Sequence, residues 1–153
     1  MQASVDFHRP WLYGWVNDRD YDALLRRAED PRSDINLLVR ESDGAILGFF
    51  NLSEIARGFF QSAYLGYGAV AEYAGQGYMS RGMQLLLRKA FEGLKLHRVE
   101  ANIQPGNANS LALVQRAGFV KEGFSPQYLK IGGEWRDHER WAIREEMWRA
   151  RFR

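Results

Sequence analysis

The chain has 153 residues, a net charge of +2 and 46% hydrophobic residues, which suit one globular domain over residues 1–153. It has no cysteine and three scattered histidines, so a disulfide framework, a thiolate metal site and a cysteine nucleophile are excluded and no metal is expected. No apolar run is long enough to span a membrane and the charge is balanced, so we expect a cytoplasmic domain without membrane or direct nucleic-acid contacts.

The first half of the chain predicts one short helix followed by antiparallel strands. Apolar residues at helical spacing predict a helix over 20–28, which Asp30-Pro31 closes. Alternating apolar residues over 35–39 predict a strand, and the turn Ser42-Asp43-Gly44 returns it as a second strand over 45–52. A third strand is predicted over 59–70, with Gly66 and Gly68 in its middle, and glycines there suggest a bulge or the close approach of a ligand.

The second half predicts two helices, one strand between them and a closing hairpin. The clearest helix covers 78–94, a strand follows over 98–103, and a second helix covers 107–117 with Gly118 at its expected stop. Strands over 119–130 and 134–143 flank a Gly132-Gly133 turn, and the basic tail over 149–153 is predicted to be solvated. The order predicts an α+β fold with a mixed sheet rather than a doubly wound one.

A glycine-rich loop joins the third strand to the clearest helix and is the first candidate site. Gly75 and Gly77 let the backbone approach an anion at the start of a helix, where free amides favour a phosphate or pyrophosphate. An ordinary strand-to-helix turn explains the same glycines equally well. No lysine follows Gly77, which excludes a Walker loop, and the third glycine of a dinucleotide fingerprint is missing, so NAD remains a minor alternative.

A second polar cluster follows the next strand, where Asn107 and Ser110 open a helix. Capping of that helix alone would explain either residue. The two clusters nevertheless both follow the carboxyl ends of neighbouring strands, where open sheets bind ligands. We therefore expect them to converge on one site.

Several motifs of the chain resemble the GNAT superfamily of acetyl-CoA-dependent N-acetyltransferases, and within it the RimJ/RimL-like ribosomal-protein-alanine branch. The matching segments cover roughly residues 7–143 and include Asn51-Leu52-Ser53, Gly75-Gln76-Gly77-Tyr78-Met79, Asn107-x-x-Ser110 with Gly118-Phe119, and Gly133-Glu134-Trp135-Arg136-Asp137-His138. The resemblance implies a mostly antiparallel sheet flanked by helices, with a V-shaped split between the strands that end near Val70 and Ile103. The first strand and helix usual in the family are expected to be missing.

The resemblance also implies a role for each site residue. The strand ending at Val70 would pair with the pantetheine arm, and Asn107 would bond that arm or help set the acetyl group. Ser110 would face the departing thiolate and supply its proton. The pyrophosphate would be held by the loop and the helix start, which comprise Gly75, Gln76, Gly77, Tyr78, Met79 and Ser80.

The implied function is transfer of an acetyl group from acetyl-CoA to a primary amine by direct attack in a ternary complex. A protein N-terminus, as in a ribosomal protein, is the expected acceptor, and the chain is expected to be a monomer or homodimer. A small amine, or a non-catalytic CoA-binding or ribosome-associated module, remains an alternative.

The general base stays unassigned at this level. Relatives often carry a carboxylate at the position of Gln127, and the remaining candidates are Glu54, Glu100, Asp137 and His138. An α-amine has a pKa near 8, so part of it is neutral without any base.

Overall fold

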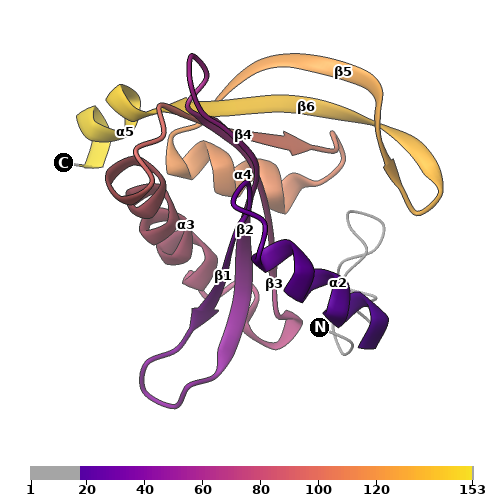
Figure 1. Cartoon of the computed structure of the whole chain (residues 1–153), viewed down its shortest axis with the longest axis vertical. Coiled ribbons are helices and arrows are strands. Elements are labelled where there is room, and N and C mark those ends of the chain that lie inside the picture. Colours follow the sequence, from indigo (N-terminus) through magenta and orange to yellow (C-terminus); the bar gives the residue numbers. More distant parts are fainter. Residues whose placement is uncertain (1–17, 153) are drawn as a thin grey trace.

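The structure, a computed structural model, describes residues 18–152. Figure 1 shows a curved sheet with helices packed against it. The elements in chain order are α2 (Asp18–Ala28), β1 (Asp34–Val39), β2 (Ile46–Ala56), β3 (Ser62–Ala69), the 3-10 turn η2 (Ala71–Tyr73), α3 (Tyr78–Arg88), the π-helical turn η3 (Lys89–Gly93), β4 (Arg98–Ile103), α4 (Ala108–Ala117), β5 (Val120–Ile131), β6 (Glu134–Arg144) and α5 (Glu145–Phe152).

The described strands form one 6-stranded sheet in the order β1-β2-β3-β4-β6-β5, and every neighbouring pair except β3–β4 is antiparallel. Alternate side chains on each strand point to opposite faces. One face, which we call the helix face, carries Phe50, Leu65 and Ala101 into a core shared with α3 and α4. The other, the second face, carries Asn51, Gly66 and their neighbours in register.

The parallel pair β3–β4 is joined at one end only. Ser62, Ala63 and Tyr64 pair with Arg98, Val99 and Glu100, and the two strands do not pair beyond these residues. β3 nevertheless runs on to Ala69 beside β2, and β4 runs on to Ile103 beside β6. The two strands therefore separate toward their carboxyl ends, which confirms the predicted V-shaped split and the mixed α+β fold.

The bulge expected at the glycines of β3 lies elsewhere. Gly66 and Gly68 pair in regular register with β2, whereas the register shifts between Ser53 and Ala56 of β2. Glu54, in that interval, has a φ of 48°. The extra residue thus belongs to β2, and Gly66 of β3 leaves space above the sheet instead of kinking the strand.

The basic tail over 149–153 was predicted to be solvated, and residues 150–152 are exposed, although they belong to a helix that was not predicted. Residues 145–152 form α5, and Trp148 is 4% exposed. Its ring lies 5.6 Å from that of Phe91 in η3. The many charged residues of this segment gave no sign of burial in the sequence, but burial of the Trp148 side chain packs the helix against the core.

The other predicted elements match the structure to within a few residues. β3 is shorter than predicted because Phe59 and Phe60 lie in the exposed turn after β2. The prediction of a missing first strand and helix concerns the segment before residue 18, which lies outside the described residues. Among the helices of residues 18–152, none has the length and apolar character needed to cross a membrane.

The strand glycines give a stability prediction. A Cβ on Gly48 would lie 2.6 Å from the carbonyl oxygen of Gly68, whereas one on Gly66 would meet nothing within 4 Å. Gly48→Ala should therefore destabilise the fold by about 1–3 kcal/mol through overpacking against backbone. Gly66→Ala, the matched control, should leave stability unchanged or raise it by about 0.5–1 kcal/mol. Urea unfolding measures both, and equal stability of the two variants would contradict this packing.

Candidate active site

The loop between β3 and α3 presents free backbone amides. Gly75 and Gly77 have φ values of 74° and 82°, a conformation that favours glycine. Gly77 is the N-cap of α3 and provides no side-chain hydrogen bond to the helix, and the first turn of α3 has no acidic residue. The first amide groups of α3 therefore have no intrahelical or capping partner and face a site of positive potential suited to an anion.

The other residues predicted to bind the cofactor lie in or beside this loop. Val70 follows β3, and its amide donates to the carbonyl oxygen of Leu47 at 2.8 Å. The side-chain amide of Gln76 donates to the carbonyl oxygen of Glu72 at 3.1 Å, which braces the loop. Tyr78, Met79 and Ser80 form the first turn of α3.

Two of these side chains already have structural roles. The Tyr78 hydroxyl accepts a hydrogen bond from Arg40 at 3.4 Å, and Met79 packs against the core. Their side chains hold the loop on the sheet, and their backbone amides stay available to a phosphate.

Asn107 and Ser110 lie at the start of α4, beyond the end of β4. The amide of Ser110 donates to Oδ1 of Asn107 at 3.3 Å, so Asn107 is the N-cap of the helix. The capping interpretation of Asn107 is therefore correct. It leaves the side-chain nitrogen of Asn107 as the group that can bond a ligand.

Tyr67, which sequence reasoning missed, contacts Ser110 across the split. Its hydroxyl oxygen lies 2.5 Å from Oγ of Ser110, and its ring lies 5.9 Å from that of Phe50. Burial raises the pKa of Tyr67 to about 12, so the phenol is neutral at physiological pH. Nothing in the sequence near Tyr67 or Ser110 signals this pairing, which arises because β3 and α4 meet on the helix face.

A neutral Tyr67 can prepare Ser110 to donate a proton. A phenol is a stronger acid than an aliphatic alcohol, so we assign the shared hydrogen bond as Tyr67 donating to Oγ of Ser110. The proton of Ser110 is then free to point elsewhere. Hydrogen bonds that run in one direction polarise each other, which makes the outer hydroxyl a better donor.

Each of the four candidate bases contacts another group of the protein. Glu100 accepts a hydrogen bond from Nε of Arg98 at 2.7 Å, and Glu54 lies 3.6 Å from Arg32. Oδ1 of Asp137 accepts the amide hydrogen of Gln127 at 2.7 Å. His138 is 3% exposed, and its Nδ1 lies 2.9 Å from the carbonyl oxygen of Arg136. Each group already has a structural partner, and none of these contacts singles out a base.

The arrangement fits a long ligand that carries both amides and phosphates. Within residues 18–152, the edge of β3 that faces the split lacks a strand partner beyond Tyr64, so its backbone groups can pair with the amides of an extended arm. At one end of that edge lie the free amides of α3, and near it lies the Tyr67–Ser110 pair. These features match the pantetheine arm, the pyrophosphate and the thioester of acetyl-CoA.

Comparison with known proteins identifies the family. The family model of the acetyltransferase (GNAT) domain matches residues 2–120, and the chain belongs to this family. Enzymes of the family use acetyl-CoA, and the prediction of an N-acetyltransferase is confirmed at this level.

The relatives include the RimJ-type branch. The chain is 40% identical to the probable N-acetyltransferase YjcK of Bacillus subtilis over 124 residues, 81% of this chain and 67% of that protein. It is 38% identical to the ribosomal protein uS5 alanine N-acetyltransferase of Escherichia coli over 103 residues, 67% of this chain and 53% of that protein. The match therefore spans about half to two thirds of these relatives.

Solved structures agree with the fold. Mycobacterium smegmatis RimJ in complex with CoA-disulfide superposes with a TM-score of 0.84 at 27% identity, covering 94% of this chain and 73% of that chain. A spermidine N-acetyltransferase from Vibrio cholerae superposes with a TM-score of 0.80, over 95% of this chain and 87% of that chain, but at 20% identity this shows the fold alone. The predicted GNAT fold and its RimJ-like character are confirmed.

The glycine loop predicts how CoA binding responds to a charge. Gly77→Asp places a carboxylate at the helix start where the pyrophosphate would lie, so CoA affinity should fall by more than about tenfold. Gly44→Asp is the matched control, because Gly44 also has a positive φ of 73° and a Cβ there would meet nothing within 4 Å, but it lies in the β1–β2 turn. Calorimetric titration with CoA measures both variants. If both variants bind CoA with the same affinity, the loop over 75–80 is not the pyrophosphate site.

The Tyr67–Ser110 pair predicts coupled kinetic effects. Ser110→Ala should lower kcat by about 10²-fold with little change in the KM for acetyl-CoA, because its proton is needed only as the thiolate leaves. Tyr67→Phe keeps the ring and should lower kcat by about tenfold through loss of the polarising hydrogen bond. If the two act as one unit, the double variant loses little more than Ser110→Ala alone. Steady-state kinetics measures kcat for the three variants, and thermal melts measure their stability. The coupling is refuted if the losses in kcat are additive, or if they only follow a loss of stability.

Proposed function

We propose that this protein transfers an acetyl group from acetyl-CoA to the N-terminal α-amine of a protein, a ribosomal protein among the candidates. The observation that carries the proposal is the 38% identity to an enzyme named for acetylating an alanine of ribosomal protein uS5. The open split between β3 and β4 supports it, since an extended chain end can enter there.

The charge of the second face supports a single amine over a polyamine. Arg98 donates to both Glu100, at 2.7 Å, and Glu122, at 3.0 Å. These bonds hold the pKa of the Glu122 carboxyl below its ordinary value, so it stays ionised and paired. A polyamine carries several cations and would be favoured by unpaired carboxylates, and both of these carboxylates are already bound to Arg98.

The residues divide the reaction between them. Acetyl-CoA, when bound, supplies the activated acetyl group. The amine nitrogen forms a bond to the acetyl carbon, the carbon–sulfur bond breaks, and the amine loses one proton to solvent. Ser110, supported by Tyr67, gives a proton to the departing sulfur and recovers one from solvent, so the products are an N-acetyl amide and the CoA thiol.

An α-amine suits this site because no dedicated base is evident among the described residues. Its pKa is about 8, against about 10.4 for lysine, so a much larger fraction is neutral at physiological pH. The rising limb of the pH–rate profile should therefore follow the acceptor. Replacing Glu54, Glu100 or Asp137 by its amide should leave the rising limb unchanged. If one of these variants loses the limb, the replaced carboxylate is the base.

The acceptor class can be tested with one panel. Acetyl-CoA is offered with peptides that begin with Ala, Ser or Met, with an N-blocked lysine peptide, and with a polyamine–aminoglycoside mixture. We expect turnover with the free α-amine peptides and little with the blocked lysine peptide. Turnover confined to the mixture would replace the proposal with a small-amine acetyltransferase. Tight CoA binding without any turnover would favour a non-catalytic CoA-binding module.

A further inference from the structure

Two asparagine side chains on the second face have oxygen atoms without a hydrogen-bond donor in the part of the chain that the structure describes. Oδ1 of Asn51 on β2 and Oδ1 of Asn102 on β4 are both buried and unpaired there. Asn51 as a whole is 7% exposed. Buried polar atoms in native proteins are nearly always paired, so an unpaired oxygen is a feature that a bound group can satisfy.

The register brings both asparagines to the rim of the split. Asn51 pairs directly with Gly66 of β3. The β3–β4 pairing ends at Tyr64 and Glu100, so Asn102, two residues further along β4, lies across the opening from Gly66. Alternation puts Asn51, Gly66 and Asn102 on the second face, because Phe50, Leu65 and Ala101 point into the core on the helix face.

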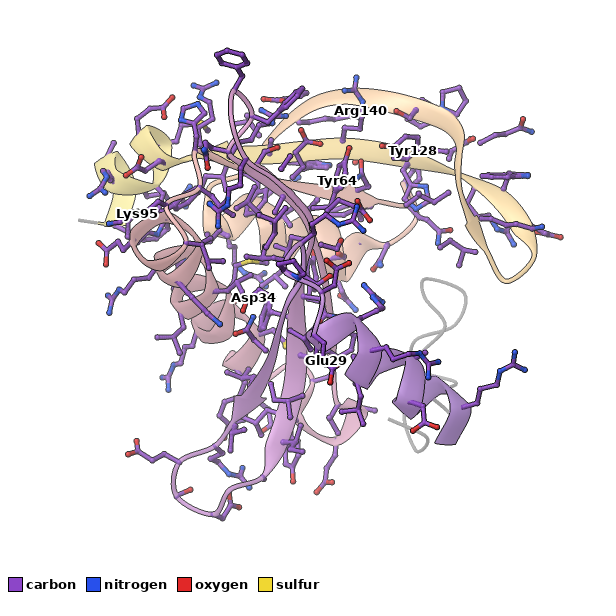
Figure 2. All side chains as sticks on the ribbon, in the orientation of Figure 1. Glu29, Asp34, Tyr64, Lys95, Tyr128 and Arg140 are labelled. Atoms are coloured by element: carbon purple, nitrogen blue, oxygen red, sulfur yellow. The ribbon has the colours of Figure 1, made fainter. Side chains whose placement is uncertain are left out.

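The position between the two asparagines has no side chain. A Cβ built on Gly66 would meet no heavy atom within 4 Å. Tyr64, two residues before Gly66 and on the same face of β3, shares a side-chain hydrogen bond with Tyr128, which raises the pKa of Tyr64. Figure 2 labels Tyr64 and Tyr128, which lie along the curved part of the sheet.

We propose that Asn51 and Asn102 bind the acceptor amine over Gly66, each accepting one N–H hydrogen bond. The inference rests on the proposed function and names the residues that orient its acceptor. A neutral primary amine has two N–H donors and one lone pair. Two amide oxygens satisfy both donors and leave the lone pair free to attack an acetyl group held in the split.

Uncharged acceptors suit this task better than carboxylates. A carboxylate beside the amine would stabilise the ammonium form and raise its pKa, which removes the lone pair at neutral pH. Amide oxygens accept the same hydrogen bonds without that electrostatic effect. The amine would then approach from the second face, opposite the Tyr67–Ser110 pair, which lies on the helix face.

The first test replaces each oxygen with an apolar group of similar size. Asn51→Leu and Asn102→Leu should each weaken binding of an alanine-initiated peptide to the CoA-loaded protein by about tenfold, measured by calorimetry, with a similar rise in the acceptor KM. CoA affinity should not change. The melting temperature should stay level or rise, since an unpaired buried oxygen has been removed.

Asn36→Leu is the matched control on the helix face. Asn36 accepts a hydrogen bond from Lys89 at 2.6 Å and donates to Asp34 at 2.8 Å. This variant should lower the melting temperature and leave acceptor affinity unchanged. If Asn51→Leu and Asn102→Leu also lower stability but not acceptor affinity, the two asparagines are structural and the inference is wrong.

A second test uses the pH profile, which a structural role would not move. Asn51→Asp places a carboxylate beside the amine and should shift the rising limb of kcat to higher pH by about one unit or more, because the ammonium form is stabilised. An unmoved limb would overturn the inference while the proposed function stands. If the wild-type protein acetylates no α-amine in the panel above, the proposed function fails, and this inference fails with it.

Discussion

The early end of the pairing between β3 and β4 is the constraint on which the site depends. Each strand keeps a long antiparallel partner, since β3 follows β2 to Ala69 and β4 follows β6 to Ile103. Parallel pairing is slightly less stable per residue than antiparallel pairing, so in the curved sheet the strands separate at the central parallel pair, β3 and β4. The result is a set of unpaired backbone groups in the middle of a sheet, where a ligand with amides can complete the ladder.

The elements around the split are held by close packing on the helix face. A Cβ on Gly82 of α3 would lie 2.6 Å from the ring of Phe50, so the helix sits directly against β2. This contact fixes the start of α3, and with it the amides offered to a phosphate. The packed helix holds the anion site in a fixed position, and the glycines of the loop before it let the backbone approach the ligand closely.

The two faces of the sheet divide the chemistry. Tyr67 and Ser110 meet on the helix face, where burial keeps the tyrosine protonated, and they are suited to giving a proton to a departing sulfur. The second face carries Asn51 and Asn102, whose oxygens have no partner within residues 18–152, and is suited to receiving an amine. In the proposed mechanism, the proton donor and the amine reach the split from opposite sides of the sheet. A neutral amine needs no strong base there, which agrees with glutamine at position 127 and with the structural partners of the candidate carboxylates.

Local pattern by itself determined most of the elements, because helical spacing, strand alternation and capping are properties of neighbouring residues. It predicted β4 over 98–103, the N-cap at Asn107 and the glycine loop before α3. Only the tertiary structure decided which strand carries the bulge, that Trp148 folds α5 onto Phe91, and that Tyr67 meets Ser110. These features join residues far apart in the chain, and they follow from register and burial, which no local pattern contains.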